Sequence, residues 1–145
     1  MVEERLTWAE QEGSGLDLSE VEDIVKTAAQ DVGGLSISSD KDAGYIRIFI
    51  GPPSGDPESV SGDPQVRIWT SGTEAFFIDV PGGFGYQEFD DVPEGQVATL
   101  HLLVTLASRY LHGHFEEKEE QRSFGRRRRY LEISSRNEVY RLYQR

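Results

Sequence analysis

The sequence predicts an α+β fold in which a mainly antiparallel sheet packs against two helices. Three observations support this prediction. Apolar residues recur at helical spacing over about residues 18–31 and again over about 93–112. Elsewhere, apolar and polar residues alternate as they do in strands. The turns that join these alternating segments are too short for parallel crossovers, so neighbouring strands should be antiparallel.

An N-terminal helix is expected over about residues 18–31, after a polar leader of residues 1–15 that we expect to be flexible. Ser19 and Glu22 have the three-residue spacing of a capping box at a helix start. Gly33-Gly34 ends the apolar pattern and therefore the helix.

Five short strands are expected between the two helices. The first two should form a hairpin around the turn residues 40–44. Residues 51–64 contain four prolines and three glycines, so they should form an irregular loop. The expected strands are residues 35–37, 45–50, 66–69, 75–80 and 84–89.

A long core helix is expected over about residues 93–112. Pro93 suits the first helical position, and Glu94 complements the positive end of the helix dipole. The apolar side chains of this segment recur at helical spacing, which predicts a helix buried against the sheet. That stripe consists of Val97, Leu100, Val104, Ala107 and Leu111.

The C-terminal region is expected to hold a charged segment and a final hairpin. Residues 116–120 (EEKEE) are interpreted as a solvated charge run. Residues 130–133 and 139–143 alternate as strands around a turn at 134–137. A helix over residues 138–144 is an alternative, because Glu, Leu, Gln and Arg favour helices.

The charge of the chain is unevenly distributed. The formal net charge is −11, but residues 1–120 carry 24 Asp and Glu against 7 Lys and Arg, and residues 121–145 carry 2 against 8. An acidic body repels nucleic acid and anionic membranes and attracts basic partners. The absence of cysteine excludes disulfides and thiolate chemistry. No stretch has the pattern of a signal peptide or a membrane span, so we expect a cytoplasmic protein with residues 16–145 in one domain.

No motif in the sequence indicates a reaction, so we expect a protein that is not an enzyme and needs no cofactor. His112 and His114, with Glu116 or Glu117, form the one metal-like cluster, and a metal-dependent enzyme is the corresponding alternative. His101 lies eleven residues before His112, about 16 Å away along a helix, so it cannot complete a zinc site. We therefore expect no tightly bound metal.

The run Arg126-Arg127-Arg128-Arg129 has two interpretations. With nearby aromatic residues it has the composition of a nucleic-acid-binding surface, which would suit a nucleic-acid-associated or phage/host regulatory protein. On a strand, however, alternate side chains point to opposite faces, and the acidic body supplies carboxylates for ion pairs. Internal pairing is the favoured interpretation, because the acidic body disfavours the approach of a phosphate backbone.

Residues 75–112 combine a strand, a Pro-Gly-Gly turn, an aromatic-rich segment, Asp-Asp-Val-Pro-Glu and an apolar helix. This order resembles small acidic immunity proteins of bacterial polymorphic toxin systems. The Arg-rich C-terminal hairpin departs from that pattern. The resemblance implies a cytosolic α+β protein that neutralises a cognate toxin. A non-enzymatic protein that binds a basic partner, such as a toxin domain, is therefore the leading hypothesis. Its candidate contacts are Asp56, Glu58, Asp63, Glu88, Asp90 and Asp91.

Overall fold

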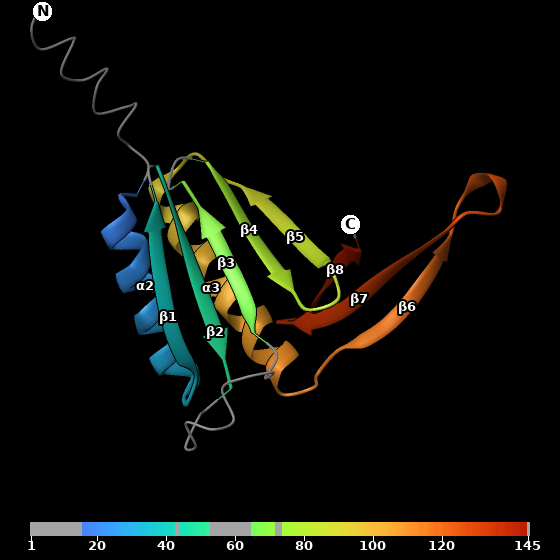
Figure 1. Cartoon of the computed structure of the whole chain (residues 1–145), viewed down its shortest axis with the longest axis horizontal. Coiled ribbons are helices and arrows are strands. Elements are labelled where there is room, and N and C mark those ends of the chain that lie inside the picture. The colour runs from blue at the N-terminus through green and yellow to red at the C-terminus, as the bar shows by residue number, and fades with distance from the viewer. Residues whose placement is uncertain (1–15, 43, 53–64, 72–73, 145) are drawn as a thin grey trace, which may run out of the picture.

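The computed structural model describes residues 16–42, 44–52, 65–71 and 74–144, and it confirms the α+β prediction. Its single antiparallel sheet has eight strands in the order β1-β2-β3-β4-β5-β8-β7-β6 (Figure 1). The predicted leader of residues 1–15 and the candidate contacts Asp56, Glu58 and Asp63 lie outside the described residues. No helix in the described ranges is long and apolar enough to cross a membrane.

The described residues form two α-helices, eight strands and one short 3-10 turn. The bounds are α2 Leu18–Val32, β1 Ser36–Asp42, β2 Tyr45–Gly51, β3 Val66–Thr70, β4 Ala75–Val80, β5 Phe84–Phe89, α3 Pro93–Leu111, β6 Glu116–Gln121, the short 3-10 turn η2 Ser123–Gly125, β7 Arg127–Ser135 and β8 Glu138–Gln144.

The N-terminal helix α2 begins at the predicted residue, but its capping residue differs from the prediction. Asp17 is the N-cap, and its Oδ1 accepts a hydrogen bond of 2.9 Å from the backbone N–H of Glu20. The expected capping box of Ser19 and Glu22 is wrong, because Ser19 already lies in the first helical turn. Glu22 instead accepts hydrogen bonds from Lys26 and Ser39.

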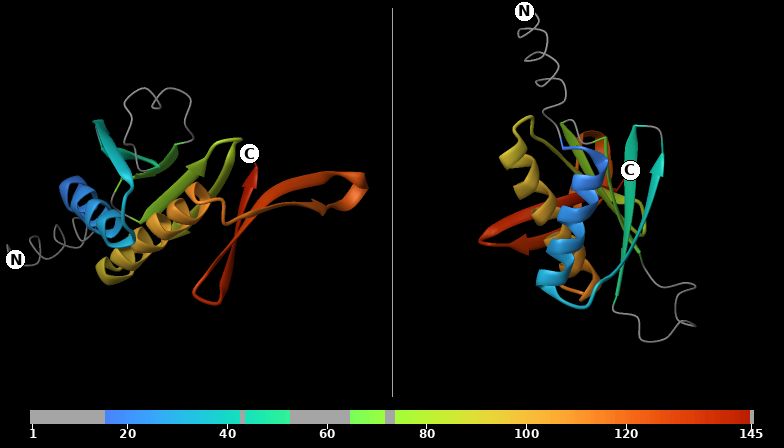
Figure 2. Two further views of the ribbon diagram at one scale, coloured as in Figure 1. Left: turned by 90° about the horizontal axis from the view of Figure 1, so that it is seen from below. Right: turned by 90° about the vertical axis from the view of Figure 1, so that its left-hand side faces the viewer.

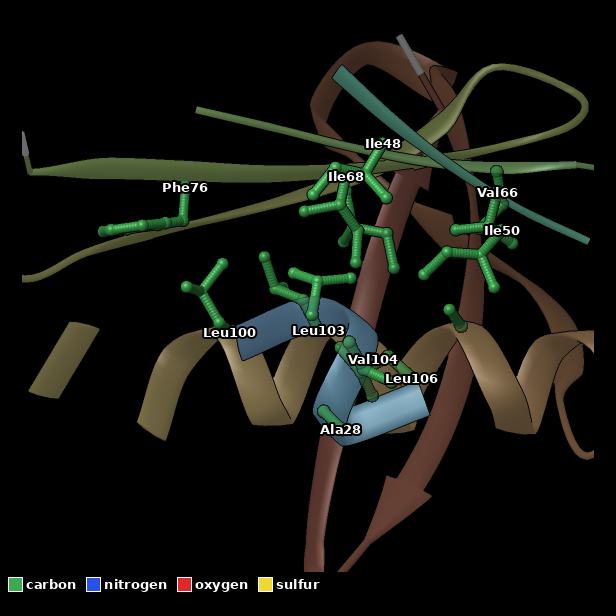
Figure 3. Close-up of a cluster of buried hydrophobic side chains, with 14 of the residues drawn as sticks. Ala28, Ile48, Ile50, Val66, Ile68, Phe76, Leu100, Leu103, Val104 and Leu106 are labelled. Carbon is green, nitrogen blue, oxygen red and sulfur yellow. The ribbon is translucent and has the colours of Figure 1, made fainter. Parts of the chain in front are cut away.

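Strands β2, β3 and β4 form the centre of the body of the protein, which comprises α2, α3 and β1–β5. Their side chains alternate between buried and half-buried positions, so one face of each strand is apolar and covered. The first strand, β1, continues to Asp42 through residues that we expected to be turn. Figure 3 shows side chains of the helices meeting the covered face, and the labelled members of the cluster are Ala28, Ile48, Ile50, Val66, Ile68, Phe76, Leu100, Leu103, Val104 and Leu106.

The core helix α3 has 19 residues and packs beside α2 on the same side of the sheet (Figure 2). Its buried residues recur at helical spacing, and Leu100, Val104 and Ala107 of the predicted stripe are among them. Val97 and Leu111 of that stripe are only half-buried. This helix ends at Leu111, and the backbone N–H of the C-cap His112 bonds to the carbonyl of Ser108.

The final hairpin is confirmed, and the alternative of a C-terminal helix is wrong. Strands β7 and β8 pair from Tyr130 with Tyr143 to Ser135 with Glu138. Arg136 and Asn137 form the two-residue turn, with φ of 50° and 68°. Positive φ at both positions is the conformation of the hairpin turns whose twist matches that of the strands.

The charged segment 116–120 is strand β6, which the sequence did not predict. None of its side chains is buried and most are exposed, as expected of a solvated charge run. Each of its residues pairs with a residue of β7, from Glu116 with Glu132 to Gln121 with Arg127. Residues 116–129 form a two-stranded extension, here called the arm. Figure 1 shows the arm projecting away from the helices and from β1–β5. No side chain of the arm is buried.

Candidate functional site: an acidic groove

An acidic groove opens where β5 and β8 diverge beside α3. These strands share only two residue pairs, Phe84 with Gln144 and Gly85 with Tyr143. Beyond them the strands separate, and the resulting groove has a volume of about 680 Å³. It is lined by Tyr86, Glu88, Asp90, Gly95, Ala98, Thr99, His101, Leu102, Thr105, Ser135, Arg136, Glu138 and Tyr140.

Two tyrosine–glutamate pairs face each other across this groove. The hydroxyl of Tyr86 donates to Glu88 on β5, and that of Tyr140 donates to Glu138 on β8, at 2.6 Å between oxygens. In both pairs the residues are two apart, so their side chains lie on one face of the strand. The rings of Tyr86 and Tyr140 meet edge to face, with centroids 5.7 Å apart.

These contacts hold both tyrosines in the neutral form. Burial raises the pKa of Tyr86 above its usual range, and the adjacent Glu88 raises it further. The hydrogen bond to Glu138 is the largest cause that raises the pKa of Tyr140, to about 12. A tyrosine with the ordinary pKa near 10 is already neutral at pH 7, so these shifts keep each hydroxyl a donor to its carboxylate well into the alkaline range. Because a carboxylate has about four acceptor positions, each glutamate keeps further positions for a bound cation.

The start of α3 fixes the third carboxylate, Asp90. Its Oδ1 accepts a 2.9 Å hydrogen bond from the N–H of Val92, and its Oδ2 lies where a Cβ on Gly95 would be, only 1.9 Å from the ideal position. The fully buried Gln96 donates to the backbone carbonyl of Asp90 at 2.9 Å and accepts from the N–H of Leu16 at 3.2 Å. Glycine at position 95 is thus required for Asp90 to keep this place.

The tight β7–β8 turn positions the carboxylate of Glu138. Arg136 holds a left-handed backbone conformation, which side chains other than glycine, asparagine and aspartate adopt at a cost. Such strained positions persist only where the surrounding structure holds them. Here the pairing of Ser135 with Glu138 holds the turn, and it brings Glu138 to the groove opposite β5.

This arrangement is suited to a guanidinium or ammonium group. Glu88, Asp90 and Glu138 supply three negative charges, against one guanidinium from Arg136 and the imidazole of His101. Carboxylates bind guanidinium through paired, charge-assisted hydrogen bonds, and aromatic faces attract cations. The groove therefore has the chemical composition to bind a guanidinium or an ammonium group.

The structure brings together two of the predicted contact residues and separates a third. Glu88 and Asp90 line the groove, whereas Asp91 is exposed and does not. The sequence reasoning missed Tyr86, Glu138 and Tyr140. The signal for them was the occurrence of tyrosine and glutamate two residues apart in both Tyr86-Gln87-Glu88 and Glu138-Val139-Tyr140.

Three of the four consecutive arginines contact other side chains of the chain. Arg127 pairs with Glu119 at 3.4 Å, and Arg129 pairs with Glu117. The guanidinium of Arg128 lies 4.2 Å from the ring centroid of Tyr143. Arg126 forms no ion pair within the described residues.

The histidines at the end of α3 do not converge on a point. The ring centroids of His112 and His114 are 6.1 Å apart, and His112 Nδ1 lies 2.7 Å from the carbonyl oxygen of Ser108. Among residues that the structure describes, no group of three or more histidine, aspartate or glutamate side chains is placed to hold a metal ion. The absence of a tightly bound metal stays a prediction.

Comparisons of this chain with protein-family models, with curated proteins and with solved structures find no significant match, so the functional argument rests on the groove itself.

Proposed function

We propose that this chain is a non-enzymatic cytoplasmic protein that binds a basic partner protein through the acidic groove. The observation that carries the proposal is the convergence of Glu88, Asp90 and Glu138 around two neutral tyrosines. An arginine or lysine of the partner would enter the groove, pair with the carboxylates and lie against a tyrosine ring.

The charge of the rest of the chain supports the same partner. Residues 1–120 carry 24 acidic against 7 basic side chains, so a basic protein would be attracted from a distance as well as at contact. Long-range attraction of this kind mainly raises the association rate and is weakened by salt.

The most plausible partner class is a toxin domain that the chain neutralises, as its resemblance to immunity proteins over residues 75–112 implies. A cationic catalytic cleft, such as that of a nuclease, would be blocked by a protein that fills it with acidic side chains. Immunity genes lie beside the genes of their toxins, so the product of the gene immediately upstream is the first candidate.

Capture of partners from the native host, across a salt series, tests this proposal. The wild-type chain should retain a basic protein at low salt and release it as salt rises. The double variant Glu88→Gln, Glu138→Gln should lose that protein. A matched variant, Asp23→Asn with Asp31→Asn, removes the same charge from exposed positions on α2, outside the groove, and should retain it.

Two results would overturn the proposal. In the first, no basic protein is captured at any salt concentration. In the second, the groove variant and the α2 variant lose the partner to the same extent, which would mean that overall charge rather than the groove is responsible. Thermal midpoints of both variants, measured in parallel, confirm that each is folded.

The alternative of nucleic-acid binding through Arg126–Arg129 has less support. Two of these guanidiniums are paired with glutamates, and a third lies on a tyrosine ring. Binding of phosphates would require at least some of these contacts to be exchanged for contacts with nucleic acid, in competition with the neighbouring carboxylates.

A further inference from the structure

The arm lacks the packing that would make it stable by itself. Its outer strand β6 is at the edge of the sheet and pairs only with β7. None of residues 116–129 is buried, and no helix lies over the arm (Figures 1 and 2). A two-stranded hairpin without an apolar face is marginally stable in water. Contact with another molecule would supply the cover that this chain does not provide.

The tip of the arm presents an aromatic side chain to solvent. Phe124 is 100% exposed, and its φ of 66° is a left-handed conformation that is costly for phenylalanine. A backbone hydrogen bond of 2.6 Å from Arg122 to Arg126 closes the turn around it. Costly backbone conformations cluster at sites that bind or clamp ligands, and bulky side chains that become buried at an interface supply much of its binding energy.

The tip is basic, in contrast to most of the chain. Between Gln121 and Arg129 there are five arginines and no acidic residue. Arg126, beside Phe124 and Gly125, has no ion-pair partner among the described residues. A surface that complements this tip should combine carboxylates with aromatic or apolar side chains. The acidic groove of this same protein has that composition.

The arm cannot reach the groove of its own chain. The tip adjoins the first residue of β7, Arg127, and the groove is lined by the last, Ser135. Those residues are eight positions apart on one strand, which is about 26 Å. Any contact between tip and groove must therefore join two copies of the chain.

We infer that the protein associates with itself by inserting the arm of one copy into the acidic groove of another. Phe124 packs against Tyr86 and Tyr140, and Arg126 pairs with Glu88 and Glu138. If two copies are related by a two-fold axis, each inserts its arm into the groove of the other and the assembly closes at a dimer. If the copies are arranged head to tail, each added copy leaves one arm and one groove free, so larger assemblies form. Because this contact occupies the groove of the proposed function, self-association competes with the basic partner.

Sedimentation analysis of the full chain over a concentration series tests this inference. The tip variant combines Phe124→Ser with Arg126→Glu, and the groove variant combines Glu88→Arg with Glu138→Arg. Each variant should reduce the association constant by roughly tenfold or more, because each removes the centre of the contact. The wild-type association should weaken as salt rises.

A mixture of the two variants provides the sharpest measurement. The tip variant keeps an intact groove, and the groove variant keeps an intact tip, so together they form one complete contact. We expect the mixture to form complexes more strongly than either variant does alone. A control variant, Asp23→Arg with Asp31→Arg, makes the same change in charge as the groove variant, but on α2. It should associate like the wild type.

A wild-type chain that stays monomeric at low salt and high concentration would overturn the inference, and so would a tip variant that associates as strongly as the wild type. Neither result bears on the proposed function, which depends on the groove alone. Conversely, if the wild type associates through its tip but neither the wild type nor the tip variant, whose groove is free, captures a basic protein from the host, the proposed function fails and the self-association stands.

Discussion

The body and the arm belong to one continuous sheet but are stabilised by different interactions. In the body, strands β2 to β4 place fully buried side chains such as Ile46, Ile68 and Phe76 under two helices. Each such side chain contributes about 1.5–3 kcal/mol through removal of apolar surface from water. In the arm, the most covered side chains are those of the charged residues Lys118, Glu120 and Arg128, and these are only half-buried.

Ion pairs and cation–aromatic contacts hold the arm together. Lys118 lies 3.0 Å from Glu132, Arg127 pairs with Glu119, and Arg129 pairs with Glu117. Exposed pairs of this kind contribute about 0–1 kcal/mol each. Regular backbone pairing is therefore no measure of local stability, and the arm should open before the body does.

Replacing one phenylalanine with alanine in each region should give the largest difference in stability between body and arm. Phe76→Ala removes a ring that is fully buried and should lower the free energy of unfolding by about 3–5 kcal/mol. Phe124→Ala removes a ring that is fully exposed and should change it by less than about 0.5 kcal/mol. Chemical denaturation of both variants at low protein concentration checks this, and similar losses would contradict the contrast between body and arm.

Replacement of the four arginines of the arm should have a smaller effect, and one that depends on salt. Changing Arg126, Arg127, Arg128 and Arg129 to Gln removes two ion pairs and one contact with an aromatic ring. We expect a loss of about 1–2 kcal/mol at low salt that shrinks as salt rises.

The same arginine variant also tests the alternative of nucleic-acid binding. If the arginines act mainly within the chain, thermal stability should fall while any affinity for DNA or RNA stays close to that of the wild type. A wild-type chain that binds nucleic acid at moderate salt, with a steep salt dependence that the variant loses, would make nucleic-acid binding the leading function.

The body was more predictable from sequence than the arm, for physical reasons. The helix expected over 93–112 agrees with α3 at Pro93–Leu111, because an apolar stripe at helical spacing reports directly on a buried face. Glu116–Gln121 carries no such signal. Glutamate and lysine are depleted in strands, and only the pairing with β7 makes this segment a strand.

The groove was only partly predictable, because its residues are distant in sequence. Glu88 and Asp90 were found through local acidity near α3. Glu138 and Tyr140 come from β8, some 50 residues later, and they reach the groove because β8 inserts between β5 and β7 in the sheet. Periodicity reports which side of a strand is covered, but it does not report which strands become neighbours.

A cap variant should have a modest effect that is confined to the body. The side chain of Asp17 bonds to the N–H of Glu20, and this hydrogen bond is the largest cause that lowers the pKa of Asp17. Asp17→Ala should therefore lower the thermal midpoint by roughly a few degrees. Ser19→Ala should change it less, which distinguishes the observed cap from the capping box that the sequence predicted. Thermal unfolding followed by circular dichroism measures both.

The smallest expected effect is an alkaline loss of stability that comes from both regions. The pKa of Tyr140 in the groove is raised to about 12, with the hydrogen bond to Glu138 as the largest cause. An unfolded tyrosine ionises near pH 10. The folded state thus holds its proton more tightly, so this stabilisation is complete below about pH 10 and is lost as the pH rises towards about 12.

Lys118 in the arm should lose stabilisation in the same direction, because its hydrogen bond to Glu132 raises its pKa above the ordinary value. At neutral pH the charged lysine pairs with the ionised Glu132, and that contribution disappears as the pH rises and the lysine loses its proton. Single variants separate the two regions. Tyr140→Phe should remove the contribution of Tyr140 and leave that of Tyr86, whose pKa is also raised. Lys118→Gln should remove that of the arm. Denaturation between pH 9 and pH 12 measures both. Because the chain has six tyrosines, the difference in tyrosinate absorbance between the wild type and Tyr140→Phe provides the separate record of Tyr140. If Tyr140→Phe left the alkaline loss unchanged while the difference absorbance showed Tyr140 ionising near pH 10, the hydroxyl of Tyr140 would not be bound to Glu138. The groove would then lack the hydrogen bond that joins Tyr140 to Glu138 in the structure.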